Sequence, residues 1–256
     1  MPFDLSIVYI TLNAEQYLAE SLEISSQLAD DILVVDSGSS DATLDIVHAR
    51  GVRLVRQQWL GYAAQKQLAI DHALHEHVLF LDADEVLSQQ AVAEIAAQLQ
   101  QHSMADAYSL PRRNWFQGKW IRHGGWWPDR VTRLVRRGTG RIKDVAVHEC
   151  WETDARVVAL ESPLEHYSSR DYSELLQKAD SYSTLAARQM FGQGRSCRRS
   201  APFWHGLSAF LRTFVLRRGF MDGTEGAAIA ASVALASMMK YAKLLELNQA
   251  TTRQRG

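Results

Sequence analysis

The chain has 256 residues, 46% of them hydrophobic, which is enough for one large domain or for one domain with a substantial appendage. Its formal net charge of −1 gives no electrostatic argument for nucleic acid, and we expect no nucleic-acid partner. Cys150 and Cys197 lack metal-ligand spacing, and because no signal sequence precedes them we expect reduced thiols in a cytoplasmic protein.

The first part of the chain predicts strands that alternate with helices. Residues 5–10 have the β-branched and aromatic content of a strand. Asn13, with Gln16 three positions later, is typical of a helix start, and this helix is expected to end near Leu28.

Five more elements are predicted before residue 82. They are a strand over 32–36, a helix ending near Arg50 with Gly51 as its stop, a short strand over 52–56, a helix over 62–74 and a buried strand over 78–81. This alternation predicts an α/β fold with a doubly wound, mostly parallel sheet.

A cluster of acids follows the strand over 78–81. Asp82 and Asp84 are two positions apart, so on extended backbone both side chains lie on the same side. Two such carboxylates could hold one Mg²⁺ or Mn²⁺ together with substrate phosphates. The alternative is that these acids favour the positive end of the next helix, which is expected to begin near Ser88.

Polar residues also end the first two predicted strands. In a parallel sheet, Thr11, Asn13 and Asp36 would share one edge with the acid cluster, and ligands bind at this edge. The turn 37–40 offers N–H groups and hydroxyls that could cradle a nucleotide, or it could be an ordinary connection. No Gly-x-Gly-x-x-Gly motif follows the first strand, so a nicotinamide or flavin cofactor is not expected, and no Walker lysine motif is present.

The character of the sequence changes after a predicted helix over 88–101 and a strand over 107–110. Residues 111–129 are rich in glycine and tryptophan, and their indole rings could stack on sugar rings or fill the core. A basic strand is predicted over 131–137. Its arginines Arg133, Arg136 and Arg137 could contact a diphosphate or an anionic acceptor, or could form a solvated face.

A reaction in which a hydroxyl group attacks needs a carboxylate that takes the proton from this hydroxyl. Glu149 is the first candidate for this base and Asp129 the second; a surface or salt-bridged acid is the alternative for Glu149. His148 and His166 are candidates for auxiliary ligands or phosphate contacts, and a structural role is the alternative for each.

The C-terminal part predicts helices. A helix over 171–190 precedes an arginine cluster, and residues 203–218 place large aromatic side chains beside arginines. Such a helix could lie in the headgroup layer of a membrane or pack on its own protein. The Ala-rich stretch 226–247 is expected to be too short in apolar length to span a bilayer.

Three motifs together resemble those of glycosyltransferase family 2, which has the GT-A fold. They are the segments 11–15, 35–43 and 81–85. The resemblance implies that Asp36 contacts the base of the nucleotide, and that Asp82 and Asp84 form the metal motif with Asp84 as the direct ligand. Lys66 stands where such enzymes often have an arginine that faces the diphosphate, and its alternative is a solvated lysine.

Within the family, five further segments resemble bacterial lipopolysaccharide-core glucosyltransferases. These are residues 124–129, 133–137, 147–149, 165–167 and 219–223. The resemblance implies a UDP-sugar donor, with UDP-glucose first, and a lipid-linked inner-core saccharide as acceptor. It also implies a peripheral location on the inner face of the cytoplasmic membrane.

The sequence therefore predicts a GT-A domain over 1–165 and a helical extension over 166–256. Residues 1–100 are expected to bind donor and divalent metal, through Thr11, Asn13, Asp36, Ser37, Lys66, Asp82 and Asp84. Residues 101–165 are expected to form the acceptor half, with Glu149 or Asp129 as the base and Arg133 in an auxiliary role. The alternatives are a sugar-nucleotide nucleotidyltransferase, which would need a Gly-rich basic loop after the first strand, and transfer to another lipid-linked or peptide acceptor.

Overall fold

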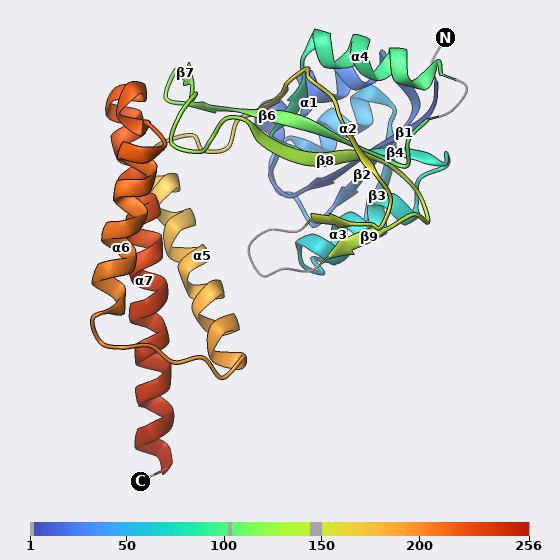
Figure 1. Ribbon diagram of the computed structural model, residues 1–256. Helices are drawn as coiled ribbons and strands as arrows, with labels where there is room; N and C mark the ends of the chain where they lie inside the picture. Colours follow the sequence, from blue (N-terminus) through green and yellow to red (C-terminus); the bar gives the residue numbers. More distant parts are fainter. Residues whose placement is uncertain (1–2, 102–103, 144–149, 256) are drawn as a thin grey trace. The chain divides into compact units, whose positions relative to one another are not determined.

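The computed structural model describes residues 3–101, 104–143 and 150–255, the last five as backbone only (Figure 1). These residues group into two units. Unit 1 contains the chain up to Arg113 together with Asp129–Tyr167, and unit 2 contains Asn114–Pro128 together with the chain from Ser168 onward. The units differ from the expected domains mainly at 114–128, a segment that groups with the C-terminal helices.

Unit 1 has strands and helices that alternate through its first half. Its elements are β1 (Phe3–Thr11), α1 (Glu15–Ser25), β2 (Ala29–Asp36), α2 (Thr43–Arg50), β3 (Arg53–Arg56), α3 (Tyr62–Asp71), β4 (His77–Asp82), β5 (Glu85–Leu87), α4 (Gln89–Leu99), the first part of β6 (Ala107–Phe116), β8 (Asp129–Arg136), β9 (Arg141–Lys143), β10 (Cys150–Glu152), β11 (Val157–Ala159) and β12 (Leu164–His166).

The main sheet has the strand order β3-β2-β1-β4-β8-β6-β12-β5. The first four strands run parallel, as the alternation of strands and helices predicts. From β8 onward the neighbours pair antiparallel where the register is defined, at β4–β8, β6–β8 and β5–β12. The predicted α/β class is confirmed, and the antiparallel half extends the sheet beyond the predicted strands.

The parallel strands are buried on both faces. On β1, Ile7 and Tyr9 belong to a core shared with α1, α2 and α4, whereas Val8 and Ile10 belong to a core shared with α3. This alternation follows from the two-residue period of a strand, and it explains why β1 is apolar almost without a break. The sheet is thus the middle of three layers.

Several elements differ in length from their predictions, among them α3 and β6. Helix α3 ends at Asp71 rather than at Leu74, because the N–H of Leu74 donates to the Asp31 carboxylate at 2.9 Å instead of continuing the helix. Strand β6 continues beyond Leu110 to Phe116. The short strand β5 is absent from the sequence-based prediction, and it matters below because it pairs with β12.

Unit 2 contains a short hairpin and a group of helices. Its elements are the end of β6, β7 (Lys119–Trp120), α5 (Tyr172–Gly192), α6 (Ala201–Leu211), the π-helical turn η1 (Arg212–Leu216), the 3-10 turn η2 (Gly219–Asp222) and α7 (Gly223–Arg255). Helices α5 and α6 both pack along α7 (Figure 1). Gly206 allows the close approach of α6, since a Cβ there would lie 3.0 Å from the Cβ of Met238.

The hairpin of unit 2 is fastened to the start of α7 by Asp222. This buried carboxylate accepts from the N–H groups of Arg122 and His123 and lies 3.1 Å from Nδ1 of His123. Nearby, the Lys119 ammonium donates to the carbonyl of Asp222 and pairs with Glu225 at 2.5 Å. The segment 219–223 therefore has a clear structural role within this unit.

Helix α7 is longer than predicted. Among the described residues, the helical segment Gly219–Ala250 is long and apolar enough to cross a bilayer by length and composition, with a mean hydropathy of 1.3 over an 18-residue window. The expectation that this region is too short in apolar length is therefore wrong on those two measures. They are weak evidence for a span, because core helices of other proteins meet them as well.

Candidate active site

The loop that follows β2 is organised by Asp36. Its carboxylate accepts from the hydroxyl of Thr11 at 2.9 Å and from the N–H groups of Gly38 and Ser39, each at 2.9 Å, and it also accepts from the Ser39 hydroxyl. Burial raises the pKa of Asp36, but the hydrogen bonds from Ser39, Gly38 and Thr11 outweigh it and hold the pKa below its ordinary value. Asp36 is thus ionised and fixes the loop, and both of its carboxylate oxygens already accept hydrogen bonds from the protein.

Asn13 and Ser37 join this loop to its neighbours. Asn13 has a positive φ of 52° and its side-chain oxygen accepts from the N–H of Ser40 at 2.8 Å, while Ala14 occupies the N-cap position of α1. The prediction that Asn13 caps the helix is therefore wrong: its side chain connects two loops across the sheet edge. The Ser37 hydroxyl accepts from the amide of Gln65 on α3 at 3.0 Å.

Asp82 ends β4 between two cations. The ammonium of Lys66 lies 2.7 Å from one carboxylate oxygen, and Nη2 of Arg133 lies 2.8 Å from the other. Burial raises the pKa of Asp82, but the charges of Lys66 and then Arg133 outweigh it and hold this pKa well below its usual range. Lys66 is itself buried, which excludes the solvated lysine that the sequence left open.

Glu85 lies beneath this group and was not singled out from the sequence. It is 0% exposed, and its two carboxylate oxygens accept from Nη2 and Nε of Arg133 at 2.7 and 2.9 Å. It also accepts from the N–H of Asp82 at 3.1 Å, and Nη1 of Arg112 lies 3.3 Å away. The guanidinium of Arg133 is therefore a buried bridge between two acids.

Asp84 has a different environment from Asp82. Its side chain is 40% exposed, and Nε2 of His166 lies 3.5 Å from one of its carboxylate oxygens. The pairing of β5 with β12 aligns His166 with Glu85, and the carbonyl of Asp84 accepts from the N–H of Tyr167 at 3.0 Å. Backbone pairing therefore fixes the histidine beside the acid, independently of the two side chains.

The donor set at Asp84 fits a divalent ion. A carboxylate and an imidazole are suitable ligands for Mn²⁺, whereas Mg²⁺ prefers oxygen ligands alone. Among the described residues no three His, Cys, Asp or Glu side chains gather closely enough to enclose a metal. Asp82 fits the ligand role less well, because both of its oxygens already face cations.

The structure describes one of the two candidate bases, Asp129, and not the other. Glu149 and the neighbouring His148 lie outside the described residues. Asp129, at the start of β8, accepts at one oxygen from both Nε and Nη2 of Arg112, at 2.9 and 2.7 Å. One oxygen of the Asp129 carboxylate is therefore already engaged by the guanidinium of Arg112.

The basic strand β8 does not present one anionic-ligand face. Arg133 is directed into the acid cluster, whereas Arg136 pairs with Glu76 at 2.7 Å and lies 3.5 Å from Asp106. The predicted site residues thus form three groups in unit 1: the Asp36 loop, the buried acid–base cluster and the Asp84–His166 pair. Their members are Thr11, Asn13, Asp36 and Ser37; Lys66, Asp82 and Arg133; and Asp84 and His166.

Sequence reasoning missed Glu85 and Arg112. Both were visible as charged residues, Glu85 as the third acid of the cluster that begins at Asp82 and Arg112 two positions after the strand predicted over 107–110. Three acids at the end of a buried strand are more than one metal ion needs. The surplus negative charge is a signal that a nearby arginine will compensate it.

Comparison with known proteins agrees with this geometry. The sequence profile of Glycosyl transferase family 2 matches residues 6–155. The lipopolysaccharide core biosynthesis glycosyltransferase LpsC of Rhizobium meliloti is 30% identical over 255 residues, covering 94% of this chain and 92% of the relative. An uncharacterized glycosyltransferase of Rickettsia prowazekii is 26% identical, over 95% of this chain and 87% of the relative.

Among solved structures, glucosyl-3-phosphoglycerate synthase from Mycobacterium tuberculosis, in complex with Mn²⁺, UDP and glucosyl-3-phosphoglycerate, has a similar fold. The TM-score is 0.51 and the identity 16%, over 76% of this chain and 81% of that one. At this identity the likeness concerns the fold alone, and it agrees with the predicted GT-A architecture. The profile match over more than half of the chain establishes that this protein is an enzyme of glycosyl transferase family 2.

Proposed function

We propose that the enzyme transfers a sugar, glucose first among the candidates, from a UDP-sugar to a saccharide of the lipopolysaccharide inner core, with inversion at the sugar carbon. The observation that supports this most is the Asp84–His166 pair at the carboxyl edge of the parallel strands. The names of the Rhizobium and Mycobacterium proteins support the acceptor class and the donor nucleotide, respectively.

In this proposal Asp84 and His166 hold a divalent ion. Asp82 pairs with Lys66 and Arg133 and so fixes the end of β4 beside them. A divalent ion bound there would neutralise the charge that develops on the departing diphosphate. Asp36, through its bonds to Thr11, Gly38 and Ser39, fixes the loop that receives the nucleotide. Direct contact of Asp36 with the base stays a prediction, and it would require some of these bonds to open.

Donor binding can be tested by thermal shift with UDP. At a hundredfold excess over its dissociation constant, a ligand stabilises the folded state by about 2.7 kcal/mol, which corresponds to roughly 5–10 °C for a chain of this size. We expect a rise of this order with UDP and Mn²⁺, and a clearly smaller rise when a chelator replaces the metal. An equal response with and without Mn²⁺ would contradict the proposed metal.

The proton acceptor can be tested with two matched variants. Glu149→Gln should keep the response to UDP and reduce transfer by about a hundredfold or more, since a positioned base typically contributes at least that much. Asp129→Asn, which removes a carboxylate already paired with Arg112, should retain more transfer than Glu149→Gln. The reverse order of activities would assign the base to Asp129.

We propose further that the reaction takes place at the cytoplasmic face of a membrane, where a lipid-linked acceptor is presented. The surface of unit 2 supports this part of the proposal and is treated next.

A further inference from the structure

The net charge of −1 conceals two oppositely charged units. Unit 2 contains 15 lysines and arginines and 6 aspartates and glutamates, a net charge of +9, so unit 1 has a net charge of −10. The asymmetry is sharpest over residues 181–221, which contain seven arginines and no acidic residue. A patch of this kind attracts anionic surfaces.

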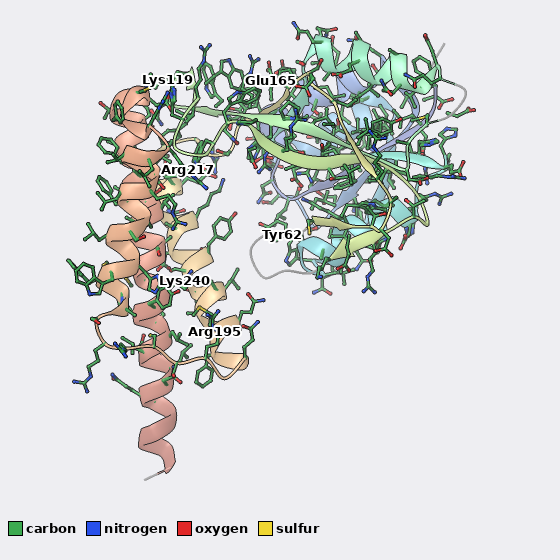
Figure 2. All side chains as sticks on the ribbon, in the orientation of Figure 1. Tyr62, Lys119, Glu165, Arg195, Arg217 and Lys240 are labelled. Carbon is green, nitrogen blue, oxygen red and sulfur yellow. The ribbon has the colours of Figure 1, made fainter. Side chains whose placement is uncertain are left out.

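Among the described side chains of unit 2, Arg195, Arg212 and Lys240 lie near one another, and no ion pair joins them to a carboxylate. Arg195 lies on the loop between α5 and α6, and Lys240 lies on α7 (Figure 2). Burial lowers the pKa of Lys240, and the nearby charges of Arg195 and Arg212 lower it further. The ion pairs among the described side chains of unit 2 join other residues: Lys119 with Glu225, His123 with Asp222, Arg170 and Lys178 with Glu174, and Lys243 with Asp180.

A pocket of about 550 Å³ opens beside these cations. Its lining includes Arg195, Ser196, Arg198, Trp204, His205 and Tyr241. The loop that forms one wall is fixed to α7, because the side-chain amide of Asn248 donates to the carbonyl of Arg195 at 3.3 Å. His205 stacks on Tyr241 at 3.8 Å between ring centroids, so the opposite wall is also ordered. Guanidinium and hydroxyl donors in one pocket suit a phosphate group.

An exposed apolar stripe runs along α6 next to the pocket. Leu207, Leu211 and Val215 follow Phe203 at intervals of four residues, and Trp204 is 61% exposed. Leu216, at the end of η1, is 77% exposed. The opposite face of α6, with Gly206 and Ala209, is buried against α7, so the helix has one packed face and one bare face.

We propose that unit 2 docks on a bilayer of anionic phospholipid, with a headgroup phosphate in the pocket beside Arg195 and Arg198 and the stripe of α6 at the boundary of the acyl chains. An apolar face flanked by arginines, without acids, has the chemistry of an interfacial helix. A stretch of 41 residues with seven arginines and no acid matches an anionic membrane surface, and binding to a protein partner would not require it. This inference concerns attachment and is independent of which sugar is transferred.

The test is flotation of the full-length protein with lipid vesicles. We expect binding to vesicles that contain phosphatidylglycerol, much weaker binding to pure phosphatidylcholine, and release by high salt, because the attraction is screened. The double variant Arg195→Gln/Arg198→Gln should bind about 25-fold more weakly, and Trp204→Ser should also bind more weakly. The matched control Arg50→Gln/Arg156→Gln removes the same charge from exposed positions in unit 1 and should bind as the unchanged protein does.

Three outcomes would overturn the inference. They are equal flotation with neutral and anionic vesicles, equal losses in the two arginine double variants, and retention on the vesicles in high salt and alkaline carbonate. The last outcome would indicate that α7 crosses the bilayer instead. None of these measurements depends on glycosyl transfer, so their failure is distinct from failure of the proposed activity.

Discussion

Replacing Asp84 by alanine is expected to reduce glycosyl transfer by at least about a thousandfold while the protein remains folded. A bound divalent ion stabilises charge in the transition state by several kcal/mol, and each 1.36 kcal/mol corresponds to a tenfold change in rate. The fold should persist because the side chain of Asp84 is 40% exposed, and because its carbonyl, not its carboxylate, accepts the hydrogen bond from Tyr167.

The same variant should lose the Mn²⁺-dependent part of the thermal response to UDP. Circular dichroism checks the fold, and a donor panel offered with truncated lipopolysaccharide measures transfer. Asp45→Ala is the matched control, because it removes an exposed carboxylate from α2 that belongs to none of the three groups of site residues. Substantial turnover by Asp84→Ala would show that the metal, if used, is held elsewhere.

His166→Ala tests the second proposed ligand of the metal. If His166 acts as a ligand, its loss should weaken the response to Mn²⁺ more than the response to Mg²⁺, because imidazole favours the transition metal. Equal weakening for both ions would instead indicate that His166 only positions Asp84.

The parallel half of the sheet could be predicted because its strands are local signals. Four short β-rich runs, each followed by a helical segment, suffice to define β1 to β4 and the edge at which Asp36 and Asp82 lie. Strand β5 could not be predicted, because three residues directly after an acid turn give no period to detect. Its existence depends on pairing with β12, far along the chain.

The partners of the acids could not be predicted for the same reason. Arg133 reaches Asp82 and Glu85 because β8 pairs antiparallel with β4, a register set by strands about 50 residues apart. From sequence alone, the arginines of β8 and the acids of β4 both appear available to ligands. In the structure they neutralise one another, which leaves Asp84 as the acid of this cluster with a substantially exposed side chain.

Composition averaged over the whole chain also concealed a functional signal. The net charge of −1 gave no argument for nucleic acid as a partner, yet unit 2 alone has a net charge of +9. The segment 114–128 contributes to this charge although it is distant in sequence from the helices with which it groups. The division of charge between the units became visible only when the fold assigned each residue to a unit.

Removing the carboxylate of Glu85 is expected to have the largest effect on stability. Glu85→Ala leaves the guanidinium of Arg133 without its two hydrogen bonds to Glu85 in a buried site, where its hydrogen bond to Asp82 at 2.8 Å remains. Loss of one partner of a buried ion pair typically costs about 3–5 kcal/mol, because the other charge stays buried without compensation. Urea denaturation followed by circular dichroism would measure this decrease in the free energy of unfolding.

The surface pair of Glu76 and Arg136 provides the matched control, because it is also a pair of glutamate and arginine but lies at exposed positions. Glu76→Ala should leave the denaturation midpoint close to that of the unchanged protein. A second variant separates charge from packing: Glu85→Met combined with Arg133→Met removes both charges, and it should be more stable than Glu85→Ala. If Glu85→Ala were no less stable than Glu76→Ala, the cluster beneath Asp82 would not be holding the strand ends together.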